Sequence, residues 1–250
     1  MLFAEELGKG RPLVAVHGFT QTHRSWLPVA RRLERGNHFT LVDAPGHGGS
    51  SDVRADLWQG ADLLAGVGGR ACYVGYSMGA RLSLHLALQH PDLVTGLVLI
   101  GVHPGIADPV ERASRHADDD ALARRVEADG VSAFVDWWLQ RPLFSTLSAS
   151  AAGREERLVN SAEGLASSLR LAGTGSQESL WDRLPELAMP VLVVAGGLDA
   201  KFADVGRRAA GAIGGNAELV LIPGTGHACH LEQPDAFCDV LAEFLARLDN

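Results

Sequence analysis

The chain has 250 residues, of which 46% are hydrophobic and 21% charged, and its formal net charge is −8. This composition is typical of a folded globular protein, and the length suits one large α/β domain. The acidic balance argues against a nucleic-acid partner, because binding phosphates needs a basic surface.

The cysteines and the first residues indicate the compartment. Cys72, Cys229 and Cys238 are odd in number and lack metal-ligand spacing, so we predict buried thiols and neither a disulfide framework nor a zinc site. Residues 1–10 are acidic and contain no long apolar run, so a signal peptide is not expected. No stretch approaches the roughly 20 apolar residues that a membrane span needs. We therefore expect a cytoplasmic protein without a membrane span.

Short apolar runs bounded by Gly, Pro or Asp alternate with helical patterns along most of the chain. The apolar runs predict buried strands at residues 13–16, 39–42, 72–74, 97–100, 191–195 and 219–222. The helical spacing predicts helices at residues 26–35, 78–89 and 234–248. Strands that alternate with helices predict an α/β fold with a mostly parallel, doubly wound sheet.

This alternation breaks between His103 and Leu180, where helical patterns occur without a convincing strand. We predict that Asp118–Asp120 cap a helix ending at Gly130, that Ser132 caps a helix at 133–140, and that a third helix covers 164–172. We expect residues 1–103 and 181–250 to form the core and residues 104–180 a helical lid. Such a lid would cover the carboxyl ends of the strands, where open α/β sheets bind ligands.

A Gly-Tyr-Ser-Met-Gly string, with Ser77 at its centre, follows one predicted strand and opens a helix. The pattern alone is weak evidence, because a serine at a helix N-terminus can simply be a surface cap. Its position at a strand-to-helix turn is what indicates a nucleophile held in a strained conformation, with glycines where a Cβ would clash.

Two further candidates follow the last two predicted strands. Asp199 comes just after residues 191–195, and His227 comes just after residues 219–222. The order Ser77, Asp199, His227 is that of a catalytic triad in which the histidine relays the serine proton and the aspartate orients the histidine. His230 is a rival for the histidine, and Asp204 is a weaker rival for the acid.

Loops after the first two strands complete the pattern. The backbone N–H groups of Phe19, in a His17-Gly18-Phe19 string, and of Met78 can form an oxyanion hole, while His17 itself braces the turn. The glycine-rich residues 43–50 are assigned a structural role. These segments together resemble the α/β-hydrolase superfamily across the whole core.

Arginines indicate which substrate such a triad would serve. Arg81 lies four residues after Ser77, on the same helix face, and suits a substrate carboxylate unless an internal salt bridge holds it. The predicted lid has no lysine and many arginines, of which most would be solvated or paired. They are Arg112, Arg115, Arg124, Arg125, Arg141, Arg154, Arg157 and Arg170. Two or three facing inward would make a pocket for several carboxylates, walled by Trp137 and Trp138 unless these form lid core.

Several strings resemble one family in particular, the 2-succinyl-6-hydroxy-2,4-cyclohexadiene-1-carboxylate synthases of menaquinone biosynthesis. The resemblance covers nearly the whole chain, and Ala80 departs from it where glycine is commoner. It lies in residues 76–81, 103–105, Arg112, Arg115, Trp137, 141–144, 164–170, 173–177 and 199–202.

The resemblance implies a lyase that eliminates pyruvate from 2-succinyl-5-enolpyruvyl-6-hydroxy-3-cyclohexene-1-carboxylate, a small tricarboxylate, with the triad as general base. It implies neither a metal nor an organic cofactor and leaves the oligomeric state open. The residues that it implies for substrate binding are Tyr76, Arg81, Arg115, Trp137, Arg157 and Arg170. Two alternatives remain: a triad hydrolase of a carboxylate-bearing ester or C–C bond, and a binding protein without catalysis.

Overall fold

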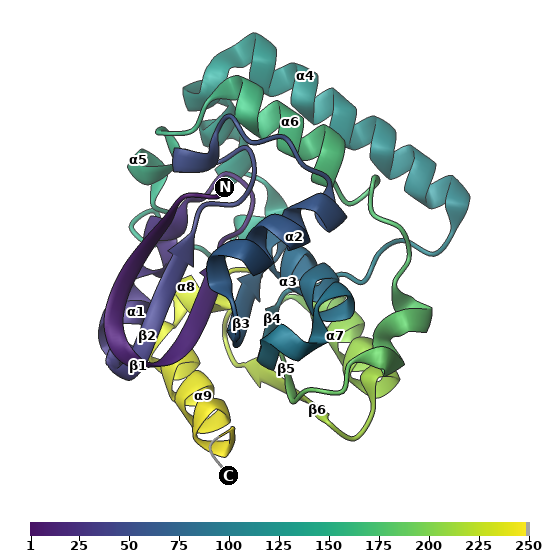
Figure 1. Ribbon diagram of the computed structural model, residues 1–250. Helices are drawn as coiled ribbons and strands as arrows, with labels where there is room; N and C mark the ends of the chain where they lie inside the picture. Colours follow the sequence, from purple (N-terminus) through teal and green to yellow (C-terminus); the bar gives the residue numbers. More distant parts are fainter. Residues whose placement is uncertain (249–250) are drawn as a thin grey trace.

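Six strands form one sheet in the computed structural model, which describes residues 1–248 (Figure 1). The order across the sheet is β2-β1-β3-β4-β5-β6, and each neighbouring pair is parallel over its main register. The strands are β1 (Ala4–Val16), β2 (Arg35–Val42), β3 (Ala71–Tyr76), β4 (Val94–Ile100), β5 (Val191–Gly196) and β6 (Ala217–Ile222). All six predicted strands are confirmed, and each is longer than predicted.

Strand β1 bends around β2 and pairs with it through both of its halves (Figure 1). Residues 11–16 pair with residues 37–42 in ascending order, and residues 13–16 also pair with β3. Residues 4–8 pair with residues 42–38 in descending order. Because Val42 is a partner of both Ala4 and Val16, β2 lies between the two halves of β1.

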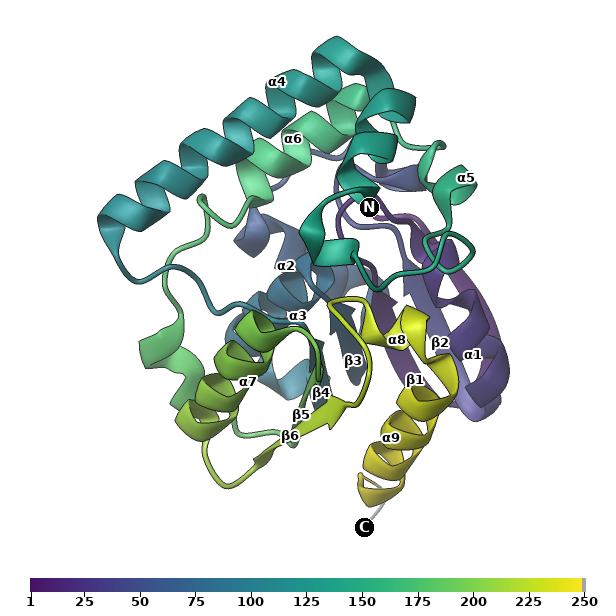
Figure 2. The ribbon, with the colours of Figure 1, turned by 180° about the vertical axis from the view of Figure 1, so that it is seen from behind.

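Helices cover both faces of the sheet, as Figures 1 and 2 show from opposite sides. On one face lie α2 (Leu57–Gly68), α3 (Met78–Gln89) and α7 (Ala200–Ile213). On the other lie α1 (Leu27–Leu33), α8 (Cys229–Glu232) and α9 (Pro234–Arg247). This arrangement confirms the predicted doubly wound α/β fold.

The two cores follow from the alternation of side chains along each strand. In β4, Leu97 and Leu99 pack with α2 and α3, whereas Val98 and Ile100 face α1 and α9. Because both faces are buried, the strands have the continuous apolar sequences that parallel sheets require. The predicted burial of the thiols is confirmed as well, since Cys72, Cys229 and Cys238 are buried and free.

The chain between β4 and β5 is helical, with α4 (Pro109–Leu139), α5 (Arg154–Arg157) and α6 (Ala162–Ala172). Helices α4 and α6 lie side by side over the carboxyl ends of the strands (Figures 1 and 2). They share an apolar cluster of their own, which includes Ala123, Val126, Phe134, Leu165 and Leu169. We call residues 104–180 the helical segment.

The predicted start of the first helix in this segment was wrong. Asp108 caps α4 by accepting hydrogen bonds from the N–H groups of Val110 and Glu111, and Pro109 occupies the first helical position. Asp118–Asp120 therefore lie inside the helix. The break at Gly130 is confirmed, because this residue has φ 75° and ψ 164° within α4.

Other boundaries also differ from prediction. Helix α1 ends at Leu33, and Arg35 already belongs to β2. Helices α2 and α7 were not predicted, although Asp56 and Gln59 form a capping box at the start of α2. Over residues 1–248, no helix combines the length and the apolar character needed to cross a membrane.

Candidate active site

Ser77 occupies a strained turn between β3 and α3. Its φ is 52° and its ψ is −105°, a conformation that non-glycine residues rarely adopt. A Cβ on Gly75 would lie 2.3 Å from the carbonyl oxygen of Gly79, and a Cβ on Gly79 would lie 2.2 Å from that of Val16. The two glycines therefore allow β3, the turn and α3 to approach closely enough to present the serine at the carboxyl end of the sheet.

His227 joins Ser77 to Asp199 through hydrogen bonds at both ring nitrogens. Its Nε2 lies 3.1 Å from Oγ of Ser77, and its Nδ1 lies 2.8 Å from Oδ2 of Asp199. With the carboxylate as acceptor, Nδ1 carries the proton and Nε2 accepts from the serine hydroxyl. The arrangement can move a proton away from Ser77 and stabilise the imidazolium that results.

The rival residues lie in different surroundings. His230 is fully buried in α8 against the rings of Tyr76 and Trp26, and neither of its ring nitrogens has a hydrogen-bond partner within residues 1–248. Asp204 is exposed on α7 and pairs with Arg207. Neither residue is hydrogen-bonded to Ser77 or His227.

The predicted oxyanion donors, Phe19 and Met78, lie close to Ser77. Phe19 and Met78 line the same pocket as Ser77 and His227. In the described chain, the N–H groups of Phe19 and Met78 have no protein acceptor, so both remain available to a ligand. Two such donors can stabilise negative charge that develops on a substrate oxygen.

A pocket of about 420 Å³ opens at Ser77, between the sheet and the helical segment. The side chains of Ile106, Leu122, Trp138, Leu143 and Leu169 make part of its wall apolar. Three cationic side chains also line it: Arg81, Arg115 and Lys201. Of the three acids in the wall, Glu111 and Asp118 are exposed and Asp119 is paired. The pocket thus suits a ligand with carboxylates.

Arg81 is buried on α3 and donates hydrogen bonds to the carbonyl oxygen of Ala172, at 2.7 Å, and to the side chain of Gln177, at 3.5 Å. No described carboxylate lies within ion-pair distance of it, so the internal salt bridge considered above is not formed. Burial, and then the charge of Arg115, lower the pKa of Arg81 to about 10, which leaves it protonated at neutral pH.

Arg115 reaches the pocket from α4, where its Nε lies 2.9 Å from Oδ1 of Asp119. The other carboxylate oxygen of Asp119 accepts the N–H of Gly175. Asp119 is thereby fully occupied as a buried support for Arg115 and for the turn after α6, rather than a solvated residue at a helix end.

Four residues predicted to bind substrate lie outside this pocket. Arg170 pairs with Asp120 and Glu127 at the surface, and Trp137 lies under the guanidinium groups of Arg125 and Arg141. Tyr76 is buried behind His227, with the two ring centroids 5.4 Å apart. Arg157 lies behind Phe19 and donates to backbone oxygens there. Their assignment to substrate binding stays a prediction.

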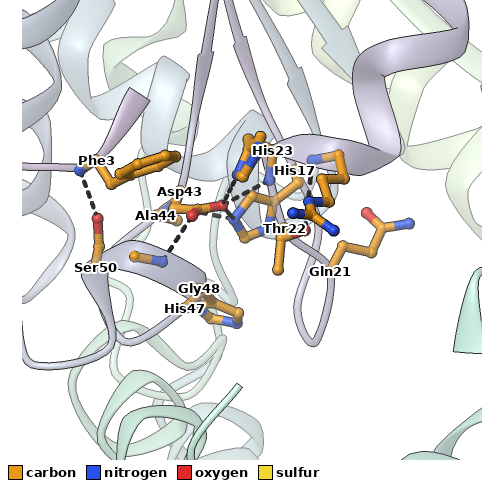
Figure 3. A network of polar contacts seen from close by, with 12 residues as sticks. Phe3, His17, Gln21, Thr22, His23, Asp43, Ala44, His47, Gly48 and Ser50 are labelled. Carbon is orange, nitrogen blue, oxygen red and sulfur yellow. Dashed lines mark hydrogen bonds and ion pairs between the residues drawn. The ribbon is translucent and has the colours of Figure 1, made fainter. Parts of the chain in front are cut away.

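The structural role predicted for His17 and for residues 43–50 fits the contacts that the structure shows (Figure 3). Nε2 of His17 accepts the N–H of Ala44, and Nδ1 lies 2.8 Å from the carbonyl oxygen of Gly18. Burial lowers the pKa of His17 to about 4, so the ring is neutral and can accept this bond. Asp43 accepts the N–H groups of His23 and Gly49. The loop after β2 therefore holds the loop after β1.

Two pocket residues were not singled out from the sequence. Lys201, at the start of α7, and His103, just after β4, both belong to strings that carry the family resemblance. Burial, and then the charges of Lys201 and Arg81, lower the pKa of His103 to about 4, which keeps the ring neutral. Within the described chain, no group of His, Cys, Asp and Glu side chains could hold a metal ion.

Comparison with known proteins gives a consistent result. Residues 13–240 match the model of the alpha/beta hydrolase family. A Serratia proteamaculans protein named 2-succinyl-6-hydroxy-2,4-cyclohexadiene-1-carboxylate synthase is 32% identical over 98% of each chain. A Bacillus subtilis protein provisionally given that name is 34% identical over 94% of this chain and 90% of its own.

Solved structures also resemble this chain over nearly its whole length. MenH from S. aureus superposes with a TM-score of 0.93 over 99% of each chain, at 30% identity. A thermophilic esterase from Thermogutta terrifontis, described with malate bound, superposes with a TM-score of 0.88 at 25% identity, over 100% of this chain and 94% of its own.

Proposed function

The chain belongs to the alpha/beta hydrolase family and, within it, to the 2-succinyl-6-hydroxy-2,4-cyclohexadiene-1-carboxylate synthases, and on this basis we propose that it is a lyase. Its substrate is 2-succinyl-5-enolpyruvyl-6-hydroxy-3-cyclohexene-1-carboxylate, and its products are pyruvate and 2-succinyl-6-hydroxy-2,4-cyclohexadiene-1-carboxylate.

The observation that carries this proposal is the presence of cationic side chains in the pocket wall. In a chain of net charge −8, three cationic side chains line the cavity beside Ser77, and the substrate has three carboxylates. Arg81 and Arg115 can form planar, paired hydrogen bonds with a carboxylate, whereas Lys201 offers a point charge. An esterase for neutral substrates has no need of such a wall.

The mechanism follows from the hydrogen bonds of the triad. Ser77 passes its hydroxyl proton to Nε2 of His227 as it removes the proton from the carbon beside the succinyl carbonyl, and Asp199 stabilises the imidazolium. The electron pair moves onto the carbonyl oxygen, where the N–H groups of Phe19 and Met78 stabilise it.

The bond between the ring carbon and the enolpyruvyl oxygen then breaks, and the ring gains its second double bond. The departing enolate takes up the proton from His227 and leaves as pyruvate. No water is consumed, and the serine is restored without an acyl intermediate.

The helical segment acts as a lid in this proposal. Its support is that Arg115, Leu122 and Trp138 from this segment face the same pocket as Ser77 and His227 from the core. Closing the segment would exclude water from the carbanion, which would otherwise be quenched by protonation. We also propose that the enzyme acts in the cytoplasm on this small molecule and binds no nucleic acid.

The deciding experiment offers the enolpyruvyl substrate and, separately, p-nitrophenyl esters to the purified protein. Pyruvate release, coupled to NADH oxidation by lactate dehydrogenase, should far exceed ester turnover and should be absent in the Ser77→Ala variant. Fast ester hydrolysis without pyruvate would instead favour a triad hydrolase, the activity named for the T. terrifontis relative.

A further inference from the structure

Two residues near the pocket, Thr20 and Ser77, share an unusual backbone conformation. Within residues 1–248, Thr20 and Ser77 are the non-glycine residues with positive φ, at 68° and 52°. Each is the chain neighbour of one proposed oxyanion donor, since Phe19 precedes Thr20 and Met78 follows Ser77. A β-branched residue such as threonine disfavours this region, so the surroundings must hold Thr20 there.

Every polar group of Thr20 has a partner. Its N–H donates to Nε2 of His47 at 3.3 Å, its hydroxyl receives a hydrogen bond from Arg157, and its carbonyl oxygen accepts from Nδ2 of Asn160 at 2.7 Å. All four side chains are buried, with Asn160 only 6% and Arg157 only 2% exposed. These contacts fix both peptide groups that flank Thr20.

Asn160 connects three parts of the chain through one amide. Its Nδ2 donates to the carbonyl oxygens of Thr20 and of Arg157, and its Oδ1 accepts the N–H of Gly48 at 2.8 Å. It thus binds the helical segment to the loops after β1 and β2. Part of the support for the loop that contains Phe19 therefore comes from the helical segment.

The guanidinium of Arg157 is also occupied by the protein. It donates to the carbonyl oxygens of Ala152, at 2.8 Å, and of Phe19, at 3.5 Å, besides the hydroxyl of Thr20. Arg157 lines a second cavity, between residues 21–31 and residues 150–157, rather than the pocket at Ser77. Arg157 therefore contacts the loop of Phe19 and Thr20 from outside the pocket at Ser77.

His47, in the loop after β2, provides the third contact on Thr20. Its Nδ1 lies 3.0 Å from the carbonyl oxygen of Pro45, so Nδ1 carries the proton and Nε2 is free to accept the N–H of Thr20. Burial, and then the charge of His17, lower the pKa of His47 to about 3, and the ring therefore stays neutral.

We propose that Asn160 and Arg157 are positioning residues, which hold Thr20 in its left-handed conformation so that the N–H of Phe19 points into the pocket. Docking of the helical segment thereby completes the oxyanion hole. This inference rests on the proposed function for its kinetic consequence, but not for its structural one.

The kinetic test compares Asn160→Ala and Arg157→Ala with Arg154→Ala. Arg154 lies with Arg157 in the short helix α5, but it forms exposed ion pairs with Asp136 and Glu155. Since one oxyanion donor contributes about 10²–10³ in kcat, we expect both test variants to lose at least about tenfold in kcat with little change in KM. Arg154→Ala should match the wild type.

Specific results would overturn the inference. A wild-type kcat in Asn160→Ala would show that the conformation of Thr20 does not depend on Asn160. A raised KM with unchanged kcat in Arg157→Ala would make Arg157 a substrate ligand. If Arg157→Ala does not fold, as judged by circular dichroism, Asn160→Ala and Asn160→Ser carry the test.

A crystal structure of Asn160→Ala tests the inference without any assay. Thr20 should leave the left-handed region, and the N–H of Phe19 should turn from the pocket. An unchanged loop would refute the positioning role even if activity were lost. If the wild type itself released no pyruvate, the proposed function would fail, and this structure would still decide the role of Asn160.

Discussion

Asp199 shows how one carboxylate serves two structural needs. Its Oδ2 lies 2.8 Å from Nδ1 of His227, while its Oδ1 accepts the N–H of Phe202 at 3.3 Å in the first turn of α7. The first turn of α7 therefore helps to orient the carboxylate toward His227. Asp204, four residues after Ala200, points to solvent and has no such support.

Substitution of the triad should reduce the chemical step and leave the fold intact. We expect Ser77→Ala, Asp199→Asn and His227→Ala each to lower kcat for pyruvate release by about 10²–10⁴, as loss of a general-base component does. Steady-state kinetics measure the loss, and circular dichroism confirms that each variant is folded.

His230→Ala is the matched control for His227→Ala. His230 is buried among rings and makes no hydrogen bond to the triad, so its loss should affect unfolding more than kcat. Equal loss of kcat in the two variants, at equal stability, would mean that the wrong histidine has been assigned.

The arginines in the pocket wall should matter more than those at the surface. Arg81→Ala removes a charge-assisted contact in a partly desolvated cavity. We expect the activation free energy derived from kcat/KM to rise by about 2–5 kcal/mol. Arg81→Lys should recover only part of this, because a point charge cannot reproduce the planar fork. The measurement is kcat/KM for pyruvate release.

Comparison of Arg115→Ala with Arg170→Ala gives the control within the helical segment. Arg115 lines the pocket and should behave like Arg81, whereas Arg170 would have to leave Asp120 and Glu127 to reach it. The activation free energy derived from kcat/KM should change by less than about 1 kcal/mol in the Arg170 variant. Near-wild-type values for Arg81→Ala and Arg115→Ala would remove the case for a carboxylate pocket.

At the scale of elements, the turn at Ser77 depends on how closely α3 approaches β1. A Cβ on Gly79 would lie 2.2 Å from the carbonyl oxygen of Val16 and 2.7 Å from that of His17. Gly79→Ala should therefore push α3 outward, lowering both stability, by about 1–3 kcal/mol, and activity. Urea unfolding and kinetics test this.

Gly66→Ala is the control, because Gly66 lies inside α2 with no neighbour within 4 Å of an added Cβ. Alanine should stabilise this helix by about 0.5–1 kcal/mol. A tolerated Gly79→Ala would show that the two elements can separate without harm to the site.

The elements that the sequence predicts well are those with continuous local patterns. The central strands β3, β4 and β5 are buried on both faces, so their apolar runs are nearly unbroken. The boundaries predicted for the helix at Met78–Gln89 are confirmed at both ends. The start of α4 was misplaced because three consecutive aspartates outweighed the stronger pair of Asp108 and Pro109. Helix α7 was missed because Asp199 was considered only as a catalytic acid.

In the site, too, the sequence predicts some features and not others. Ser77, Asp199 and His227 come together because each follows a strand and the carboxyl ends of parallel strands share one edge of the sheet, as the sequence predicts. The contacts of Thr20 with Arg157 and Asn160 join residues 137 and 140 positions apart, and no local pattern records them. For the same reason, the sequence could not separate Arg115, which faces the pocket, from Arg170, which does not.

At the scale of the whole molecule, buried histidines couple stability to pH. Burial lowers the pKa of His17, His85 and His103 to about 4 and that of His47 and His230 to about 3. Between these values and about 6.5, the unfolded chain binds protons that the folded protein does not, so stability falls as the pH falls. His23 acts in the opposite sense: burial lowers its pKa, but the hydrogen bonds and charges of Asp43 and Glu5 together more than offset this and raise it.

We expect the protein to be most stable above about pH 6.5 and to lose about 2 kcal/mol at pH 5 for each of these five histidines. This loss is large beside a typical total stability of about 5–15 kcal/mol. Urea unfolding at pH 7.5 and at pH 5 measures it. His230→Phe, which keeps a ring among Tyr76 and Trp26, should reduce the pH dependence, and equal midpoints at both pH values would contradict the prediction.

The course of β1 around β2 also bears on how the protein behaves at high concentration. The outermost ribbon on that side of the sheet is residues 4–8, because β2 is paired on both sides. Unpaired backbone at the border of a sheet can recruit a strand from another chain and start aggregation, and charged side chains there oppose it. Glu5 and Glu6 stand on this ribbon. The first residues of the fold thus protect its colloidal stability, although they are remote from the chemistry.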